Sequence, residues 1–291
     1  MPELPEVETV RAGLAAKLTG GRLETVELLR KDLRVPFPKD FAKRLAGRRL
    51  ESVGRRGKYL LWTFDDRTVL IAHLGMSGRM VLRQGAPARP ARQKPTAAAP
   101  PPAEKHEHVV FHFADGTSVA FSDPRRFGLM TLTTTAEAAT HPLLAEMGPE
   151  PLGPSFTGEY LRAAFKGRRA PLKSVLIDQR LVAGLGNIYV CEALFHARLS
   201  PWREAGSLRG KQAQALAGAV KEVLAAAIAA GGSSLRDYVQ ASGELGYFQD
   251  NWSVYGREGK PCPACKLTAR CRIARVTQGG RSTFYCERQQ R

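Results

Sequence analysis

The feature that most constrains the fold is a change in the hydrophobic pattern near residue 140. Before it, the apolar segments at 50–64, 68–76 and 108–123 are rich in β-branched and aromatic residues, and Ala-Asp-Gly at 114–116 is typical of a hairpin turn. After it, 156–167, 187–199 and 207–232 carry apolar residues at helical spacing. Runs of strands followed by runs of helices predict an α+β chain, and 291 residues suffice for about two domains.

Proline and alanine dominate one segment within the β-rich part. Thirteen of the 23 residues at 83–105 are Pro or Ala, which predicts a flexible surface insertion. The domains expected from these patterns are a β-rich domain with an N-terminal helix at 1–135, a helical domain at 141–250 and a cysteine-bearing tail at 255–291. The segments at 141–148 and 171–178 are also expected to be helical.

The charge balance identifies the class of partner. Lys and Arg number 44 against 27 Asp and Glu, giving a net charge of +17 and a pI near 10.1. Such a charge favours a polyanion, nucleic acid before an anionic membrane. The start is not basic and then apolar like a signal peptide, and no apolar run approaches the roughly 18 residues of a membrane span. We therefore expect a cytoplasmic protein without a disulfide framework.

The chain opens with MPELPEVETV, which predicts a helix with a reactive group before it. Pro5 suits the first helical position, and Val7, Val10, Leu14 and Leu18 form an apolar stripe. Pro2 and Glu3 stand outside, at the positive end of the helix dipole. If Met1 is removed, the secondary amine of Pro2 could attack an electrophilic carbon and form an iminium, with Glu3 moving protons. The alternative is an ordinary helix start.

Four of the five cysteines fall within 262–286, beginning with Cys-Pro-Ala-Cys. In a basic tail this pattern indicates a structural zinc site, and the lack of a surrounding βαβ pattern disfavours a redox motif. Two further motifs have alternative interpretations. DPRRFG at 123–128 could be a wedge that enters a duplex or a salt-bridged strand end. LIDQRLVAGLGNIY at 176–189 could be a phosphate clamp or an ordinary helical hairpin.

Together these segments resemble the bacterial formamidopyrimidine-DNA glycosylase family over nearly the whole chain. The resemblance is carried by MPELPEVET, GRRGKYL, HLGMSGR, KHEHV, DPRRFG, GLGNIY, GGSSLRDY and GRSTFYC. The start resembles the oxidised-purine branch rather than the endonuclease VIII branch, whose members typically begin MPEGPE. The resemblance implies an N-terminal helix with a β-sandwich-like domain, a helical domain with a helix–two-turn–helix, and a zinc β-hairpin.

The implied activity is that of a DNA glycosylase and abasic-site lyase acting on double-stranded DNA that contains an oxidised purine or an abasic site. The family pattern makes Pro2 the nucleophile and Glu3 its acid–base partner. It also assigns Lys58 to β-elimination and Arg281 to δ-elimination, where a guanidinium would stabilise the leaving phosphate. The protein is expected to act as a monomer.

Further positions match the family's DNA contacts. Met76, Arg125 and Phe127 match residues that fill the space of an extruded base, and the loop SSLRDYVQASG matches one that closes over that base. The DNA-binding residues implied in this way, besides those three, are His106, Arg168, Lys173, Asn187 and Glu6. For Glu6, a simple role in the first turn of the helix is nearly as good an interpretation.

The tail departs from the family at one point. A second Cys-x-x-Cys is usual, but Gln289 stands where its last cysteine would be. Three arrangements are open. The hairpin could hold without a metal, three thiolates and a water could bind the metal, or Cys271 could replace the missing fourth ligand. We predict one structural Zn²⁺ bound by four thiolates, with basic neighbours lowering the thiol pKa values; the ligands are Cys262, Cys265, Cys271 and Cys286.

Two rival functions remain at this stage. A non-catalytic DNA-binding zinc protein would explain the charge, the cysteines and DPRRFG, but it gives no role to Pro2, Glu3 and Lys58 together. An oxidised-pyrimidine glycosylase of the endonuclease VIII branch would use the same chemistry on other lesions.

Overall fold

The computed structural model describes residues 2–84, 105–233, 240–265 and 271–291. They form two compact units, one of residues 2, 6–84, 105–145, 233 and 240–246, and one of residues 3–5, 146–232, 247–265 and 271–291. The α+β class predicted from the sequence is confirmed. The predicted insertion falls mostly outside the described residues, as does the centre of the predicted base-covering loop.

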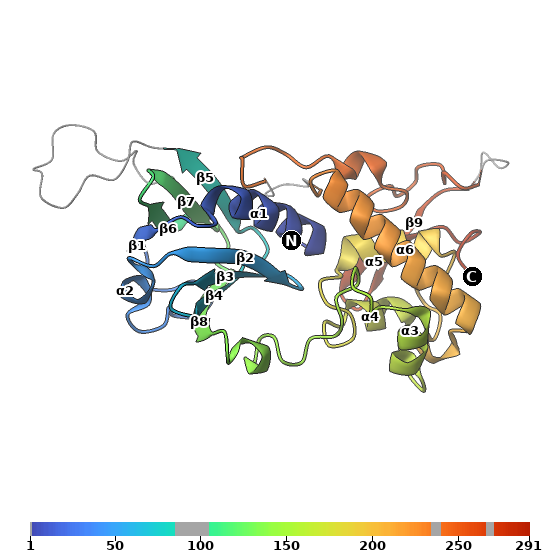
Figure 1. The fold of residues 1–291 in the computed structure, drawn as a ribbon. Helices are drawn as coiled ribbons and strands as arrows, with labels where there is room; N and C mark the ends of the chain where they lie inside the picture. Colours follow the sequence, from blue (N-terminus) through green and yellow to red (C-terminus); the bar gives the residue numbers. More distant parts are fainter. Residues whose placement is uncertain (1, 85–104, 234–239, 266–270) are drawn as a thin grey trace, which may run out of the picture. The chain divides into compact units, whose positions relative to one another are not determined.

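The first unit is a β-sandwich with one long helix (Figure 1). One sheet has the order β1-β6-β7-β5 and the other β2-β3-β4-β8, and every neighbouring pair is antiparallel. The strands are β1 (Leu23–Leu28), β2 (Leu50–Arg56), β3 (Tyr59–Phe64), β4 (Thr68–His73), β5 (Arg79–Gln84), β6 (Glu107–Phe113), β7 (Thr117–Ser122) and β8 (Leu129–Thr134).

Buried aromatic side chains join the two sheets. Trp62 of β3 packs on Phe111 of β6 with ring centroids 5.1 Å apart, and both rings are fully buried. Helix α1 (Leu4–Leu18) adds its predicted apolar stripe to the same core, and α2 (Phe41–Leu45) adds Phe41. The two sheets and the two helices thus share one hydrophobic core, because each sheet must bury its apolar face against another layer.

Two short chain segments, called the two crossovers below, cross from one sheet to the other, as does the longer link from β1 to β2. Residues 74–78 lead from β4 to β5, and residues 123–128 lead from β7 to β8. Because β4 pairs with β8 and β5 pairs with β7, the two crossovers lie side by side, joining the same two pairs of neighbouring strands. They carry the HLGMSG and DPRRFG motifs.

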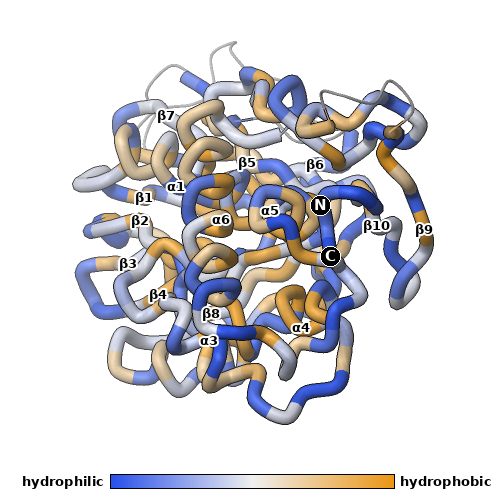
Figure 2. The backbone as a smooth tube through the Cα atoms, turned by 90° about the vertical axis from the view of Figure 1, so that its right-hand side faces the viewer, coloured by the Kyte–Doolittle hydropathy of each residue, from blue (hydrophilic) through white to orange (hydrophobic). Residues whose placement is uncertain are grey.

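The described part of the second unit contains four α-helices and a hairpin: α3 (Gly158–Phe165), α4 (Leu172–Ile177), α5 (Asn187–His196), α6 (Gly210–Ala229), β9 (Ala274–Gln278) and β10 (Arg281–Tyr285). Much of α5 is hydrophobic, as its orange tube in Figure 2 shows, and its residues 188–195 are all buried. Single-turn helices lie at Ala138–Thr140 (η1), Ala205–Ser207 (η2) and Phe248–Asn251 (η3), the first of them in the first unit.

Two segments differ from the sequence-based expectation. Residues 141–148 form turns instead of a helix, since Pro142 and Gly148 bracket too few residues to propagate one. Residues 240–246 belong to the β-rich unit, where the Leu82 amide donates to the Ala241 carbonyl at 2.8 Å. No helix in the described ranges has the length and apolar character that crossing a membrane would need.

Candidate functional site

The carboxylate of Glu3 is held at the N-terminus of α5. Its Oε1 accepts a hydrogen bond from the Ile188 amide at 3.0 Å, and its Oε2 accepts one from the Tyr189 amide at 3.4 Å. The side chain is 2% exposed. A Cβ at Gly186 would lie 2.3 Å from the Glu3 carboxyl carbon, so only glycine fits there. The helix dipole and two amides therefore fix an anion directly beside Pro2 in the chain.

Lys58 lies in the turn between β2 and β3 and is buried. The neighbouring backbone is anchored by Arg55, whose Nη1 donates to the Gly57 carbonyl at 2.8 Å and whose Nε donates to Glu8 of α1 at 2.8 Å. Burial alone would raise the pKa of Glu8, but the hydrogen bonds from Arg11 and Arg55 leave it lowered. Helix α1 is thereby tied to the turn that presents Lys58.

His73, at the end of β4, is kept neutral by its burial and by the nearby cations Lys58 and Arg34. Burial, followed by the charges of Lys58 and Arg34, lowers the pKa of His73 to about 4. Its Nδ1 accepts from the Gly75 amide at 2.9 Å, and its ring lies 4.9 Å from that of Tyr59. A neutral imidazole therefore holds the start of the crossover that carries Met76.

The two crossovers carry three of the predicted DNA-binding residues, and a fourth, His106, is hydrogen-bonded to one of these crossovers. Met76 is 37% exposed on one crossover and Phe127 is 43% exposed on the other. The Arg125 guanidinium lies 4.7 Å from the centroid of the Phe127 ring. His106, exposed just before β6, accepts through its carbonyl from the Asp123 amide at 3.0 Å. Exposed large apolar side chains next to cations suit contact with nucleic acid bases.

The β9–β10 hairpin presents Arg281 in the second unit. Arg281 is exposed at the start of β10, directly after Gly279 and Gly280, which turn the chain with φ of 57° and 72°. Asn187 at the start of α5 donates from Nδ2 to the Ser282 carbonyl at 2.9 Å. The amide that the sequence analysis assigned to DNA phosphate is thus engaged with the hairpin.

Lys173 of α4 has a similar arrangement. Its side chain is 1% exposed, and its Nζ donates to Thr283 Oγ1 at 2.7 Å and to the Ser282 carbonyl at 3.2 Å. Burial lowers the pKa of Lys173. The ammonium therefore ties α4 to the strand that carries Arg281, and in this structure it faces protein rather than solvent.

Glu6 and Arg168, the remaining predicted contacts, differ in exposure. Glu6 is buried, and its Oε1 accepts from the Ser233 amide at 2.8 Å, at the beginning of the predicted base-covering loop. Arg168 is exposed after α3, and its Nε donates to the Ala164 carbonyl at 2.8 Å. Glu6 thus anchors a loop, and Arg168 presents a cation on the surface.

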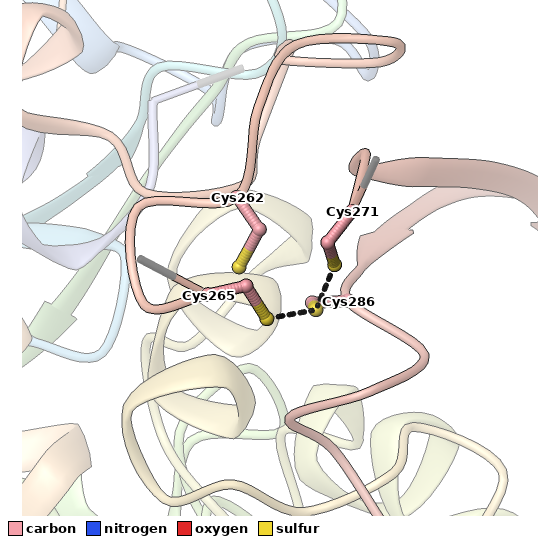
Figure 3. Close-up of side chains that lie close together, drawn as sticks. All are labelled: Cys262, Cys265, Cys271 and Cys286. Carbon is pink, nitrogen blue, oxygen red and sulfur yellow. Dashed lines mark hydrogen bonds between the residues drawn. The ribbon is translucent and has the colours of Figure 1, made fainter. Parts of the chain in front are cut away.

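The four cysteines of the tail converge (Figure 3). One sulfur from each lies within 4.8 Å of every other, with Cys271–Cys286 at 3.4 Å and Cys265–Cys286 at 3.7 Å. In a tetrahedral site with zinc–sulfur distances near 2.3 Å, the sulfurs would be about 3.8 Å apart. The cluster therefore has the donor set and the spacing to hold a metal ion, with Cys271 as one of its members.

Cys271 supplies the fourth sulfur of the cluster, and Gln289, which stands where the family has a cysteine, contacts the cluster from outside. Gln289 Nε2 donates to Cys265 Sγ at 3.2 Å, so this side chain faces the cluster as a donor. That contact lowers the pKa of Cys265 to about 7, whereas burial raises the pKa of Cys262 to about 11 and of Cys271 to about 12. The expected general lowering by basic neighbours is wrong, because burial dominates at two of these thiols.

Sequence reasoning missed several residues that position the site. His73, Ser77 and Asp123 lie inside motifs quoted above but drew no role, since their partners are distant in sequence. Glu192 was also missed, although its carboxylate accepts from the amides of 253–255 at 2.8–3.0 Å and thereby holds Tyr255 near Asn187. A charged residue inside an otherwise apolar helix, as Glu192 is in α5, was the available signal.

The family models match both units. Residues 1–130 match the formamidopyrimidine-DNA glycosylase N-terminal domain, and residues 147–239 match the formamidopyrimidine-DNA glycosylase H2TH domain. A formamidopyrimidine-DNA glycosylase of Roseobacter denitrificans is 53% identical over 291 residues, covering 100% of both chains. One of Brucella ovis is 53% identical over 298 residues, covering 98% of each.

Solved structures of Fpg proteins have a similar fold over nearly the whole chain. The Fpg protein of Thermus thermophilus has a TM-score of 0.83 at 40% identity, covering 99% of this chain and 98% of that one. A Lactococcus lactis Fpg mutant in complex with DNA containing Fapy-dG has a TM-score of 0.86 at 33% identity, covering 100% of both. The fold and the paired domains define a DNA-repair glycosylase architecture. The chain belongs to the formamidopyrimidine-DNA glycosylase family.

Proposed function

We propose that this protein is a bifunctional DNA glycosylase and abasic-site lyase that excises oxidised purines such as 8-oxoguanine and formamidopyrimidines. It would act in base excision repair, in the bacterial cytoplasm where the chromosome lies. The observation that carries the proposal is the Glu3 carboxylate fixed at the N-terminus of α5, directly beside Pro2. The complexes of related Fpg proteins with Fapy-dG and abasic-site DNA support the substrate class.

The proposed first step joins enzyme and sugar. After removal of Met1, the Pro2 nitrogen attacks C1′ of the damaged nucleotide and the glycosidic bond breaks. The base leaves with a proton, and the amine loses its own proton. The C1′–O4′ bond of the sugar then breaks as the C1′=N iminium forms, and O4′ takes up a proton. Glu3 is the group placed to pass these protons, since its position is fixed before the substrate arrives.

The two strand cuts need cations where phosphates depart. In β-elimination a C2′ proton is removed and the C3′–O3′ bond breaks, and we assign Lys58 to the departing phosphate. In δ-elimination a C4′ proton is removed and the C5′–O5′ bond breaks, and we assign Arg281 to the second phosphate. A guanidinium does not give up its proton at neutral pH, so its role there is charge stabilisation.

Recognition of the lesion would use the two crossovers and the helical unit. Met76, Arg125 and Phe127 would fill the space left by the extruded base. His106 and Arg168 are exposed cationic or polar groups suited to the DNA backbone. Lys173, Asn187 and Glu6 would act through what they hold, namely the β10 strand and the segment that begins at Ser233.

We further propose one structural Zn²⁺ bound by the four-cysteine cluster of Cys262, Cys265, Cys271 and Cys286. A closed set of four thiolates is typical of structural zinc. The ion would cross-link the β9–β10 hairpin to the Cys262–Cys265 loop, and its chemistry would end there. Gln289 would donate to one thiolate without binding the metal.

Borohydride trapping on abasic DNA tests the catalytic proposal. The processed wild-type chain should form a covalent adduct, while Pro2→Gly and a chain with one residue inserted between Met1 and Pro2 should trap far less at similar DNA affinity. Full trapping by the extended, unprocessed protein would contradict the role of the amine. DNA binding with no adduct from the wild type would favour the non-catalytic zinc protein.

The lesion class is tested by excision from matched duplexes. Duplexes that contain 8-oxoguanine or thymine glycol, in the same sequence and each opposite its ordinary partner, should be compared under single-turnover conditions. Faster excision of 8-oxoguanine is expected. A preference for thymine glycol would contradict this and indicate an oxidised-pyrimidine glycosylase.

A further inference from the structure

The two crossovers of the β-sandwich are in direct backbone contact. Gly75, with φ of +65°, approaches Gly128 and Phe127 so closely that a Cβ on it would lie 2.5 Å from the Gly128 nitrogen and from the Phe127 carbonyl carbon. Met76 follows Gly75, and Phe127 precedes Gly128. The two exposed apolar side chains therefore stand on backbone segments that cannot move independently while this contact holds.

One buried carboxylate connects these segments. Asp123 is fully buried at the end of β7. Its Oδ1 accepts from the Ser77 hydroxyl at 2.6 Å and from the Arg125 amide at 3.3 Å, and its Oδ2 accepts from the Gly128 amide at 2.7 Å. Ser77 belongs to the other crossover, so a single side chain bonds to both.

The polar groups around Asp123 close the arrangement. The Ser77 oxygen, itself buried, also accepts from the Arg125 amide at 3.2 Å. The Asp123 amide donates to the His106 carbonyl at 3.0 Å, and the ring of His108 lies with Nε2 2.8 Å from the Asp123 carbonyl oxygen, to which it donates. Among the described residues, every hydrogen bond to the carboxylate comes from the two crossovers, and none comes from a strand.

We propose that Asp123 is a positioning residue that holds Met76, Arg125 and Phe127 in one fixed arrangement for insertion into DNA. This rests on the proposed function, in which those three residues fill the space of the extruded base. The sheets have their own ladders and a shared aromatic core, so they do not need Asp123 to form. Opening a duplex needs a wedge that is already rigid, because a mobile one would lose part of its binding energy to ordering.

Asp123→Asn tests the proposal with almost no change in volume. A carboxamide has one acceptor oxygen, so at least one of the three donors must face an NH₂ group. Processing of an 8-oxoguanine duplex should fall about tenfold or more, while borohydride trapping on single-stranded abasic DNA should change by less than about twofold. Asp115→Asn is the matched control, since Asp115 accepts one amide bond in the exposed β6–β7 turn. It should leave both activities unchanged.

A double-mutant cycle separates positioning from general stability. If Asp123 acts through the wedge, Asp123→Asn should cost little on a Phe127→Ala background, so the two effects should be strongly non-additive. Ser77→Ala keeps the carboxylate and removes only the bridging hydroxyl. Ser77→Ala should show the same duplex-selective loss, but a smaller one. If Asp123→Asn does not fold, Ser77→Ala serves as the test in its place.

Each outcome has one interpretation. Equal loss on duplex and single-stranded DNA, or additive effects in the cycle, would reduce Asp123 to a stability residue and overturn the proposal. Duplex-selective loss in Phe127→Ala but none in Asp123→Asn or Ser77→Ala would overturn it while the proposed wedge stands. No duplex-selective loss in Phe127→Ala would overturn the wedge itself, and with it the role given to Asp123.

Discussion

The protein presents functional side chains from two very different supports. In the first unit, Met76 and Phe127 stand on crossovers between two four-stranded sheets, fixed by backbone contact and a buried carboxylate. In the second unit, Arg281 stands on a hairpin of two five-residue strands. The first support is built from a large hydrophobic core, and the second has few residues of its own to bury.

The difference shows why the cysteines lie where they do. A two-stranded hairpin is marginally stable at best in water, so it needs other attachments. The attachments of the hairpin include the cysteine cluster, the Lys173 ammonium and the Asn187 amide. The crossovers need no metal because the sheets on either side already fix their ends. Loss of the metal should therefore affect the hairpin most, and a larger side chain placed against the backbone should affect the crossovers most.

Loss of the cluster should have the largest effect. Binding of a structural zinc contributes on the order of 10 kcal/mol to folding of the segment that holds it, so Cys286→Ser should release the hairpin and lower strand cleavage at least about a hundredfold. Zinc content, and cleavage of duplex abasic DNA, are the measurements. Cys191→Ser, a buried cysteine outside the cluster, is the control. Full zinc and full cleavage in Cys286→Ser would contradict the metal's supporting role.

Two exchanges within the cluster sharpen this result. Cys271→Ser should lose most of its zinc. Because Gln289 Nε2 already lies 3.2 Å from Cys265 Sγ, the double variant Cys271→Ser/Gln289→Cys places a thiol close enough to restore binding. The thiolate-to-cobalt absorption of the Co²⁺-loaded proteins reports the number of sulfur ligands independently of activity. Wild-type zinc affinity in Cys271→Ser alone would exclude Cys271 as a ligand.

Crowding of the crossovers should have the next largest effect. Gly75→Ala combines a left-handed backbone with a clash against the Gly128 nitrogen, so we expect a loss of about 3 kcal/mol in unfolding free energy. Gly243→Ala, at φ of +89° with no atom of the described residues within 4 Å, should have only the backbone cost of about 1 kcal/mol. Urea denaturation measures both. Similar losses in the two variants would mean that the crossovers yield easily.

The smallest expected effect is the pH dependence from His73. Its pKa is about 4 in the folded chain against about 6.5 when unfolded, so the unfolded chain alone takes up a proton as pH falls from 6.5 to 4. Stability should drop by about 2.5 kcal/mol over that range and be little affected above it. His73→Gln should remove this component. His141→Gln is the control, since His141 also accepts from an amide two residues on. An unchanged pH profile in His73→Gln would contradict the assignment.

The local pattern of the sequence determined the α+β class, the first helix with its apolar stripe, the hairpin at 114–116 and the cluster of candidate residues around Pro2. These follow from short-range chemistry, namely periodicity, turn residues and cysteine spacing. Family resemblance added the roles of Lys58 and Arg281. The misassigned helix at 141–148 shows the limit of short apolar segments as signals.

The tertiary structure decided what each of these residues touches. Only folding brings Glu3 to α5, 185 residues away, and Lys173 to Thr283, 110 residues away. Only folding sets Ser77 against Asp123 and Gln289 against Cys265. Buried polar groups must find partners wherever the chain places them, so the partner depends on the topology rather than on neighbours in sequence. That is why the sequence named the residues proposed to meet DNA and only the structure identified those that hold them in place.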